Sequence, residues 1–521
     1  MIDKKILCFL LGRAMFAMSI AYVLPICYAF FSMQNQRISI FFTALMFICL
    51  IFAVLFSYNG QGHKQRIKIS ESAASMILVW IVLSIIGSIP FMAVYWMTPI
   101  TALLETVGNL TSAGLSLIPQ DAPYILKLWQ SVLMWLGSFI FLTMLVTVFP
   151  EVSGCFGLDL SLSQGQIFSP MLGQMRFMAR KILMIYEFIT LISFITFKLA
   201  GLENWDALLM AMRCISTGGG NYFAGKGSIY VEYAATFSML LACGNFLLYY
   251  RLIQTVRPPL SSLNLKTAIK IKTFAKSVHS LILKFFTLLR KNSLTNLKIF
   301  FSNSEVKFLL LTIFIGTFVI TFTTFSKYYF EDGNMSFRLA LFHIVSFIST
   351  TGLTAIDITE APNFDRFLLF LLVIIGGCMG SVTGGLKIIR IIILFKLAAI
   401  ETKKVIHPRM ITNIKVNGVA VSMKIIGRVL SFFFLSAITL FTCSVILSLS
   451  GQAFSTSVAM SIACLTNIGQ LPGICDAATF LALPAILKIV CCMILVIGRM
   501  EIFAFLIFIS TISIRKKQND F

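Results

Sequence analysis

Ten long apolar runs divide this chain, and each is long enough to cross a bilayer as an α-helix, which needs about 20 apolar residues. They lie at roughly 6–31, 38–57, 73–97, 125–149, 180–200, 229–250, 306–329, 364–397, 425–449 and 480–511. Hydrophobic residues make up 58% of the 521 residues and charged residues only 12%, whereas about a quarter of a soluble domain is charged. The runs therefore predict an all-α polytopic membrane protein and argue against a soluble enzyme, a disordered chain or a nucleic-acid-binding protein.

The charges between these runs alternate in sign along the chain. Lys and Arg gather at both ends and after the second, fourth, sixth and eighth runs, for example at Lys64, Arg176, Lys266 and Lys403, whereas the other loops are acidic or neutral. By the positive-inside rule, this alternation predicts that both termini are cytoplasmic. It also accounts for the net charge of +22 without an acidic partner. We interpret the basic stretch 251–298 as an inner-face anchor near anionic lipid rather than as a nucleic-acid site.

Four of the other loops follow one pattern, in which a short apolar stretch precedes a cluster of Ser, Thr and Gly. The stretches cover 99–110, 205–215, 336–348 and 454–465, and about a dozen residues are too few to cross a bilayer. The clusters, which we call loops 1 to 4, are Leu110–Ser116, Ile215–Asn221, Ser349–Thr354 and Leu465–Gln470. The order span, half-helix, loop, span thus occurs four times, as a degenerate repeat.

The four loops are under one physical constraint, because irregular backbone at membrane depth is tolerated only inside protein or beside water. They therefore predict a central pathway with pseudo-fourfold symmetry, after an N-terminal transmembrane helix pair. Glycine lets carbonyls point inward, and rings of carbonyls can replace the hydration shell of an alkali cation. The C-terminal ends of the half-helices also favour a cation. Ordinary small-residue turns are the alternative, but four in register with the topology favour a pore.

Three further segments carry a family resemblance. They are the glycine-rich segment Gly376–Lys387 (GGCMGSVTGGLK), the segment His407-Pro408-Arg409 followed by Lys415–Gly418, and Gly498-Arg499-Met500-Glu501-Ile502. With loop 3, they make the chain similar to the TrkH/TrkG potassium uptake proteins of the Trk, Ktr and HKT cation transporter superfamily. The resemblance covers about Ile69 to Thr511. The extra N-terminal helix pair is that of the Trk branch.

The resemblance implies that the four loops form a selectivity filter that binds potassium. The candidate filter residues are Thr111, Ser112, Ala113, Gly114, Ile215, Ser216, Thr217, Gly218, Ser349, Thr350, Thr351, Gly352, Thr466, Asn467, Ile468 and Gly469. Two loops depart from the family pattern. Ser112 and Ala113 replace two threonines, and Gly220-Asn221 stands where an aromatic residue and a serine are common. A sodium or mixed monovalent cation transporter therefore stays open as an alternative.

The glycine-rich segment is the candidate gate beneath this filter. Its residues are Gly376, Gly377, Gly380, Gly384, Gly385 and Lys387, joined by Arg499 from the last helix. Each glycine disfavours helix by about 1 kcal/mol relative to alanine, so a run that could otherwise cross is interrupted. Close helix packing through small residues is the alternative for the glycines. Snorkelling to the interface is the alternative for Lys387, and Glu501 is a candidate partner of Arg499.

The resemblance also implies partners and location. We expect a homodimer in the bacterial inner membrane, in contact with its lipid and with a cytoplasmic TrkA-type nucleotide-binding regulator. Potassium is expected as the transported ion, and the chain has no P-loop or dinucleotide motif, so we expect no nucleotide to bind to it. Channel-like and proton-coupled transport both stay open.

The expected organisation has six parts. They are the helix pair 1–70, pore repeat 1 at 71–176, pore repeat 2 at 177–256, a basic cytoplasmic insertion at 257–304, pore repeat 3 with the gate at 305–424, and pore repeat 4 with the tail at 425–521. An intramembrane enzyme would need a nucleophile–base or metal cluster within the spans. The histidines are scattered, and His343 on the third half-helix is expected to be a hydrogen-bonded structural residue. We therefore do not expect an enzyme.

Overall fold

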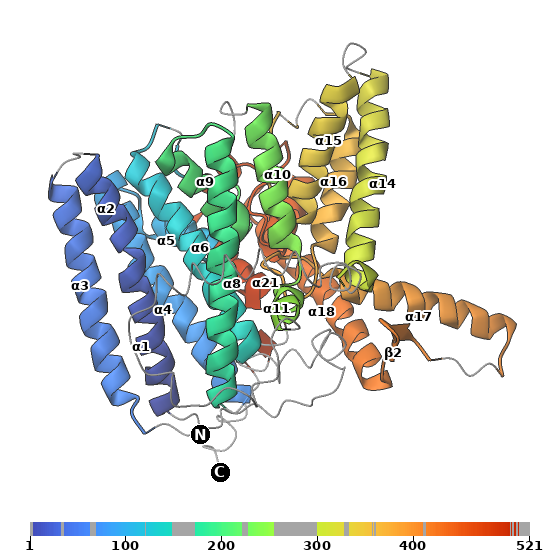
Figure 1. Cartoon of the computed structure of the whole chain (residues 1–521), viewed down its shortest axis with the longest axis horizontal. Helices are drawn as coiled ribbons and strands as arrows, with labels where there is room; N and C mark the ends of the chain where they lie inside the picture. The colour runs from blue at the N-terminus through green and yellow to red at the C-terminus, as the bar shows by residue number, and fades with distance from the viewer. Residues whose placement is uncertain are drawn as a thin grey trace.

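The computed structural model describes residues 4–32, 36–62, 69–119, 121–147, 172–220, 228–254, 300–327, 333–356, 358, 361–409, 413–471, 473–500, 502, 505, 506 and 509. Apart from one short hairpin, its regular elements are helices, most of which stand side by side (Figure 1). Seven of the described helices are long and apolar enough to cross a membrane. The predicted all-α membrane protein is therefore confirmed.

The seven long helices account for seven of the ten apolar runs. The first run forms two helices that abut at Tyr22 and together make one span. The seven spans are formed by α1 (Lys4–Ala21) with α2 (Val23–Phe31), α3 (Gln36–Asn59), α4 (Ile69–Tyr95), α6 (Tyr124–Thr147), α8 (Leu172–Leu199), α14 (Ser304–Lys327) and α18 (Met423–Ser448).

The other three runs are interrupted rather than continuous. The sixth divides into α10 (Ile229–Cys243) and α11 (Phe246–Gln254), because Asn245 Oδ1 accepts the backbone N–H of Leu247 at 2.9 Å and so begins a new helix. The eighth divides into α16 (Asn363–Ile375) and α17 (Ile388–Ile406) around the glycine-rich segment. The tenth divides into α20 (Ala477–Leu481) and α21 (Ala485–Met500) on either side of Pro484.

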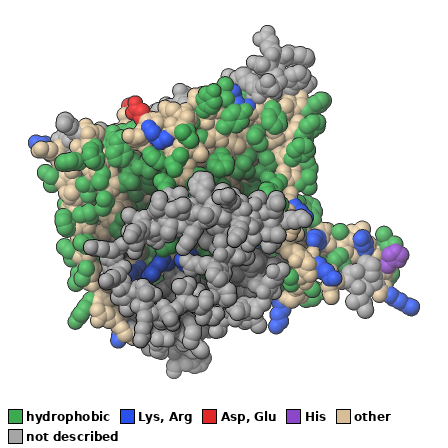
Figure 2. Space-filling view, viewed as in Figure 1, with side chains coloured by type: hydrophobic (Ala, Val, Ile, Leu, Met, Phe, Trp, Pro, Cys, Tyr) green, Lys and Arg blue, Asp and Glu red, His purple; other side chains and the backbone are tan. Residues whose placement is uncertain are grey.

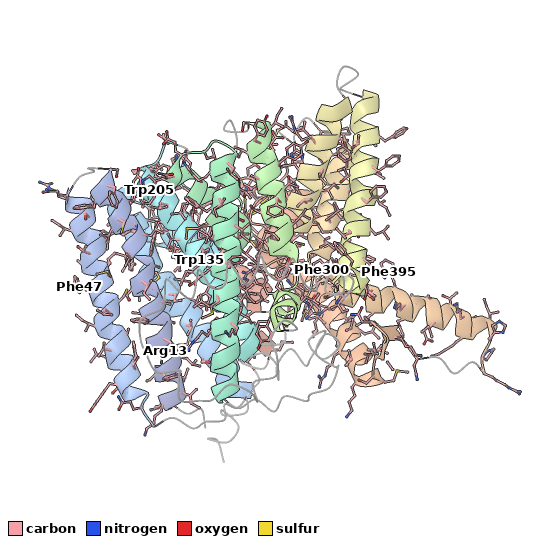
Figure 3. All side chains as sticks on the ribbon, in the orientation of Figure 1. Arg13, Phe47, Trp135, Trp205, Phe300 and Phe395 are labelled. Carbon is pink, nitrogen blue, oxygen red and sulfur yellow. The ribbon has the colours of Figure 1, made fainter. Side chains whose placement is uncertain are left out.

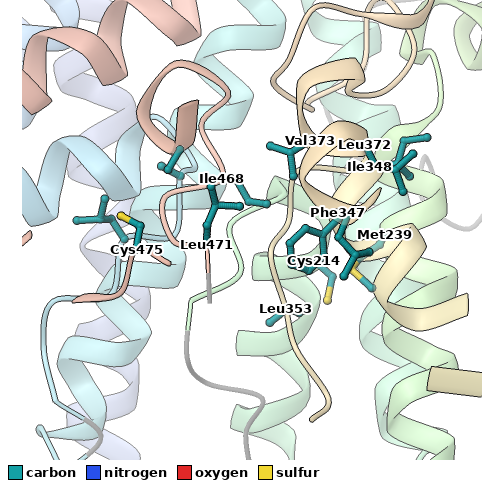
Figure 4. Close-up of a cluster of buried hydrophobic side chains, with 14 of the residues drawn as sticks. Cys214, Met239, Phe347, Ile348, Leu353, Leu372, Val373, Ile468, Leu471 and Cys475 are labelled. Carbon is teal, nitrogen blue, oxygen red and sulfur yellow. The ribbon is translucent and has the colours of Figure 1, made fainter. Parts of the chain in front are cut away.

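The four short apolar stretches form short helices, as predicted. They are α5 (Pro99–Leu110), α9 (Asn204–Ser216), α15 (Gly333–Ile348) and α19 (Phe454–Leu465). One large cluster of buried side chains contains members from all four. Figure 4 shows part of it, where Cys214, Phe347, Leu353 and Ile468 lie with side chains of α10 and α16. The four half-helices therefore share a single core.

The N-terminal pair packs on the first repeat through aromatic residues. Tyr22 is fully buried and stacks on Trp129 of α6, with ring centroids 4.5 Å apart and planes 12° from parallel. Trp129 donates its indole N–H to the Gly87 carbonyl of α4 at 3.1 Å. Burial of two large rings with a satisfied polar atom ties this pair to α4 and α6.

Helix α17 projects away from the bundle at the right of Figure 1. Beside it lies the hairpin of β1 (Lys415–Val416) and β2 (Val419–Ala420), whose turn places Asn417 and Gly418 in the left-handed region. A small apolar cluster joins α17, the hairpin and the start of α18. Lys and Arg side chains lie on this arm in Figure 2, whereas the bundle beside it shows mainly hydrophobic side chains. Phe395, labelled in Figure 3, is 65% exposed on the arm.

Candidate functional site

The four loops adopt one backbone conformation where each half-helix ends. The second polar residue of each is left-handed, with φ of 59° at Ser112, 58° at Thr217, 54° at Thr350 and 54° at Asn467. The next residue donates its backbone N–H to the carbonyl five positions back. These bonds run from Ala113 to Gly108 (2.7 Å), Gly218 to Arg213 (3.0 Å), Thr351 to Ser346 (2.9 Å) and Ile468 to Ala463 (3.1 Å). Left-handed backbone is rare for β-branched residues such as Thr217 and Thr350 and costs about 1–3 kcal/mol at those positions, and such strain is typical of functional sites.

The loop glycines bring the four loops into a closed ring. A Cβ added to Gly114 would lie 2.7 Å from the Gly219 nitrogen of loop 2, and one added to Gly219 would clash with the Thr351 carbonyl of loop 3. A Cβ on Gly352 would lie 2.9 Å from the Ile468 side chain of loop 4, and one on Gly469 would clash with the Ala113 carbonyl of loop 1. Each loop therefore touches the next, and only glycine allows these backbones to approach so closely.

The structure brings the candidate filter residues together, and it aligns loop 2 with the other loops in a different register from the expected one. These residues are buried, apart from Gly352, which is partly exposed. The shared bonding pattern makes Ser216–Gly219 equivalent to Thr111–Gly114, one residue further along the chain than the expected Ile215–Gly218. Ile215 lies in the last turn of α9. The expectation overlooked Gly219, because three consecutive glycines do not reveal which one faces the neighbouring loop.

Most of the loop hydroxyls are engaged within the protein, whereas Thr217 Oγ1 of loop 2 is buried with no hydrogen-bond partner among the described residues. Thr111 and Thr466 each donate to the carbonyl four residues back, at 2.8 Å. Ser112 Oγ lies 2.5 Å from Ser138 Oγ, and the hydroxyls of Ser349 and Thr351 lie 2.7 Å apart. These bonds hold the backbone in place. Main-chain carbonyls, which Ala113 also has, are the oxygens that all four loops can offer to a cation.

In two of the half-helices, a side chain accepts a hydrogen bond from the backbone just after that half-helix's own loop. Glu105 Oε2 accepts the N–H of Leu117 at 2.7 Å, and His343 Nε2 accepts that of Ala355 at 3.3 Å, each 12 residues along the chain. The other ring nitrogen of His343 bonds to the Leu339 carbonyl at 2.8 Å. The tautomer follows from these partners, with the proton on Nδ1. His343 is therefore a hydrogen-bonded structural residue, as expected.

The glycine-rich segment lies directly against the ring. Gly384 donates its N–H to the Thr350 hydroxyl of loop 3 at 2.8 Å, and a Cβ on Gly384 would clash with the Thr466 carbonyl of loop 4. Gly376, Gly380 and Gly385 have φ of 70°, 75° and 74°. Side chains are strained in that region, so the segment needs glycine for its own conformation as well as for its approach to the ring.

Lys387 and Arg499 both bind this segment. Lys387 is 5% exposed, and its Nζ donates to the Thr383 carbonyl and lies 3.1 Å from the Thr383 hydroxyl. Arg499 is 2% exposed and donates from Nη1 to the Val382 carbonyl at 2.7 Å and from Nη2 to Ser138 at 3.1 Å. Lys387 therefore bonds inward instead of snorkelling. The expected partner Glu501 lies outside the described residues.

A second anchor of the segment comes from Glu305 in the first turn of α14. Its carboxylate accepts the N–H of Met379 at 3.1 Å and the side-chain amide of Asn245 at 3.2 Å. Beside it, Phe246 donates its N–H to the Gly380 carbonyl at 3.1 Å. Sequence reasoning missed this anchor, although a carboxylate at the start of an apolar run was a usable signal.

A cavity of about 280 Å³ adjoins the segment and loop 4. Its walls are mainly apolar side chains of α16, α18, α19 and α21, and Thr383, Gly384, Lys387, Asn467 and Arg499 contribute to its lining. Two cationic side chains thus border the space beside the ring.

The fold and site define a class of protein, a polytopic helical membrane protein in which four half-helices end at one central ring of loops. Residues 38–518 match the family model of TrkH, described as a cation transport protein, and the chain belongs to this family.

Curated relatives align over most of this chain. It is 26% identical to the Trk system potassium uptake protein TrkG of Escherichia coli K12, over 96% of each chain. It is 26% identical to the TrkH of Vibrio parahaemolyticus, over 90% of this chain and 91% of that one, and to the TrkH of Halomonas elongata, over 87% of each.

A solved structure shares the fold. The crystal structure of the potassium transporter TrkH from Vibrio parahaemolyticus matches 97% of this chain with a TM-score of 0.79 and 23% identity.

Proposed function

We propose that the protein takes up potassium across the bacterial inner membrane through the ring of four loops, as the membrane subunit of a Trk system. The observation that carries this proposal is the ring itself, in which Gly114, Gly219, Gly352 and Gly469 each contact the next loop. The names of the relatives, potassium uptake proteins, support the choice of ion. Those names also point away from an enzyme.

In this proposal, main-chain carbonyls of the loops replace the hydration shell of the ion. The half-helices α5, α9, α15 and α19 direct the negative ends of their dipoles at it, which favours a cation. The membrane potential drives the movement of the ion, because it contributes a free energy of about 2.3 kcal/mol per 100 mV for each elementary charge that crosses the membrane.

The glycine-rich segment acts as the gate in this proposal. It lies against loops 3 and 4 through Gly384, and the charges of Lys387 and Arg499 beside it repel permeating cations. Transport then requires the segment to move away from the ring. A TrkA-type regulator acting on the cytoplasmic face, a homodimeric assembly and cytoplasmic termini complete the proposal.

A sodium or mixed monovalent cation transporter is the second candidate. Ser112 and Ala113 in loop 1 favour it, because one Thr hydroxyl is lost and another replaced relative to the family pattern. Competition of sodium with rubidium uptake distinguishes the two candidates.

The test is growth and rubidium influx in a bacterial strain that lacks potassium uptake. The chain should restore growth at limiting potassium, and Gly352→Arg should abolish influx at unchanged membrane abundance, since Gly352 has a φ of 74° and faces Ile468. Gly427→Arg is the matched control, because no heavy atom lies within 4 Å of a Cβ at Gly427. Normal rubidium influx in Gly352→Arg would reject the filter assignment.

A further inference from the structure

Arg213 is a buried cation in the last turn of α9, immediately behind loop 2. Its side chain is 1% exposed. Nη1 donates to the Gly219 carbonyl at 3.0 Å, Nη2 to the side-chain oxygen of Gln130 at 2.8 Å, and Nε to the Ser131 hydroxyl at 2.8 Å. Three nitrogens of one rigid guanidinium thus bind a loop carbonyl and two side chains of α6.

A carboxylate lies at the other end of this network. Gln130 accepts from Arg213 and donates its amide to Glu105 Oε1, which also accepts from Asn109 at 2.9 Å. Glu105 is fully buried and, through its other oxygen, holds Leu117 after loop 1. The network therefore joins loops 1 and 2 from behind and contains one positive and one negative side chain.

Burial of an ionisable side chain such as Arg213 at membrane depth costs free energy, and an ionisable residue at that depth therefore indicates a functional site. Arginine also differs from lysine here, because its planar fork can reach several acceptors at fixed angles, whereas an ammonium is a point charge on a flexible stem. The contacts of Arg213 use that fork.

Loop 2 needs an external anchor more than the other loops do. Gly218, Gly219 and Gly220 follow one another, and glycine has the largest backbone freedom of any residue. Gly220 also leaves room for the arginine, since a Cβ there would lie 3.2 Å from Arg213 Nη1.

Loops 1 and 4 use side chains of their own, and loop 3 is held by a serine of its half-helix. Ser112 contacts Ser138, and Asn467 donates to the Leu495 carbonyl at 2.9 Å. Ser346, which occupies the half-helix position equivalent to Arg213, donates to the Leu353 carbonyl of loop 3 at 2.7 Å. The glycines of loop 2 offer no comparable donor.

We propose that Arg213 is a positioning residue that determines cation selectivity, because it fixes the Gly219 carbonyl and, with it, the backbone of loop 2 in the ring. The proposal rests on the proposed function, since it concerns the same ring. The effect depends on the guanidinium fork, so the charge alone is not sufficient.

The test compares Arg213→Lys and Arg213→Gln with wild type. Rubidium influx is measured in the uptake-deficient strain with increasing sodium as competitor, and the potassium and sodium concentrations that protect the purified protein from heat give a second readout. Both variants should lose about tenfold in preference for potassium over sodium, the effect of losing a hydrogen bond to a charged donor. Arg37→Gln, at an exposed position on α3, is the control and should keep wild-type selectivity.

Wild-type selectivity in Arg213→Lys or Arg213→Gln at normal abundance would overturn the proposal. Should neither variant accumulate, Ser131→Ala removes the acceptor of Nε, together with the bond from Ser131 to the Lys127 carbonyl within α6, and an unchanged sodium competition in that variant would also overturn the proposal. A wild-type chain that carries no rubidium and gains no heat stability from potassium would instead reject the proposed function, so the two failures are distinguishable.

Discussion

Arg499 on the last helix donates a hydrogen bond from Nη1 to the Val382 carbonyl, at 2.7 Å, within the glycine-rich segment. Its other terminal nitrogen lies 3.1 Å from Ser138, and Ser138 in turn donates to the Ser216 carbonyl of loop 2 at 3.0 Å. The guanidinium also stacks over the Phe141 ring, 4.4 Å from its centre. One side chain therefore links the candidate gate to the ring of loops.

Replacement of Arg499 by Gln should release the glycine-rich segment. The variant loses a charged donor to Val382 and a positive charge beside the pathway, so rubidium influx without a regulator should rise, by about tenfold. Influx measured against membrane abundance checks this expectation. Unchanged or reduced influx at normal abundance would contradict the role of Arg499 in holding the segment.

Glu305→Gln tests the second anchor of the same segment. A glutamine has one oxygen acceptor where the carboxylate has two, so either Met379 or Asn245 loses its partner, at a cost of about 1–3 kcal/mol. We expect a higher basal influx with unchanged preference for potassium over sodium, because the ring is not touched. Glu401→Gln, on the exposed arm, is the matched control. An altered ion preference in Glu305→Gln would show that the glycine-rich segment and the ring of loops are not functionally separable.

Gly384→Ala should displace the segment by steric force. The added methyl group would clash with the Thr466 carbonyl, and overpacking of this kind costs about 1–3 kcal/mol. A lower melting temperature of the purified protein, together with raised basal influx, is the expected result. Gly427→Ala, which lies within α18 and meets nothing within 4 Å, should neither lower the melting temperature nor raise the basal influx. Equal melting temperatures for Gly384→Ala and wild type would mean that the contact with loop 4 is absent.

Removal of potassium should destabilise the purified protein. A ligand that binds only the folded state adds about 2.7 kcal/mol to the free energy of unfolding at one hundred times its dissociation constant. The melting temperature should therefore rise with potassium and, at equal ionic strength, much less with sodium. In Gly352→Arg, the difference between potassium and sodium in raising the melting temperature should disappear. Equal protection by sodium and potassium in the wild type would favour the mixed-cation alternative.

The half-helices could be predicted from the sequence nearly to the residue. The apolar stretch 99–110 became Pro99–Leu110, and 205–215 became Asn204–Ser216. Each is an apolar stretch that ends in a cluster of Ser, Thr and Gly, and this local signal marks both the helix and its end.

The details of the ring and of its supports could not be predicted in the same way. The register of loop 2 depends on which glycine meets Thr351, and Glu305 becomes an anchor only because folding brings Met379 to it. Both are long-range contacts. Arg213 is different, because a single arginine in an apolar half-helix was a visible signal of a buried functional cation.

The most direct test of the account is the position of a heavy alkali ion in crystals of the wild-type protein grown in rubidium. We expect an anomalous peak at the centre of the ring, encircled by main-chain carbonyls of loops 1 to 4, and the loss of this peak in Gly352→Arg. Rubidium bound elsewhere in the membrane region, with no peak inside the ring, would contradict it.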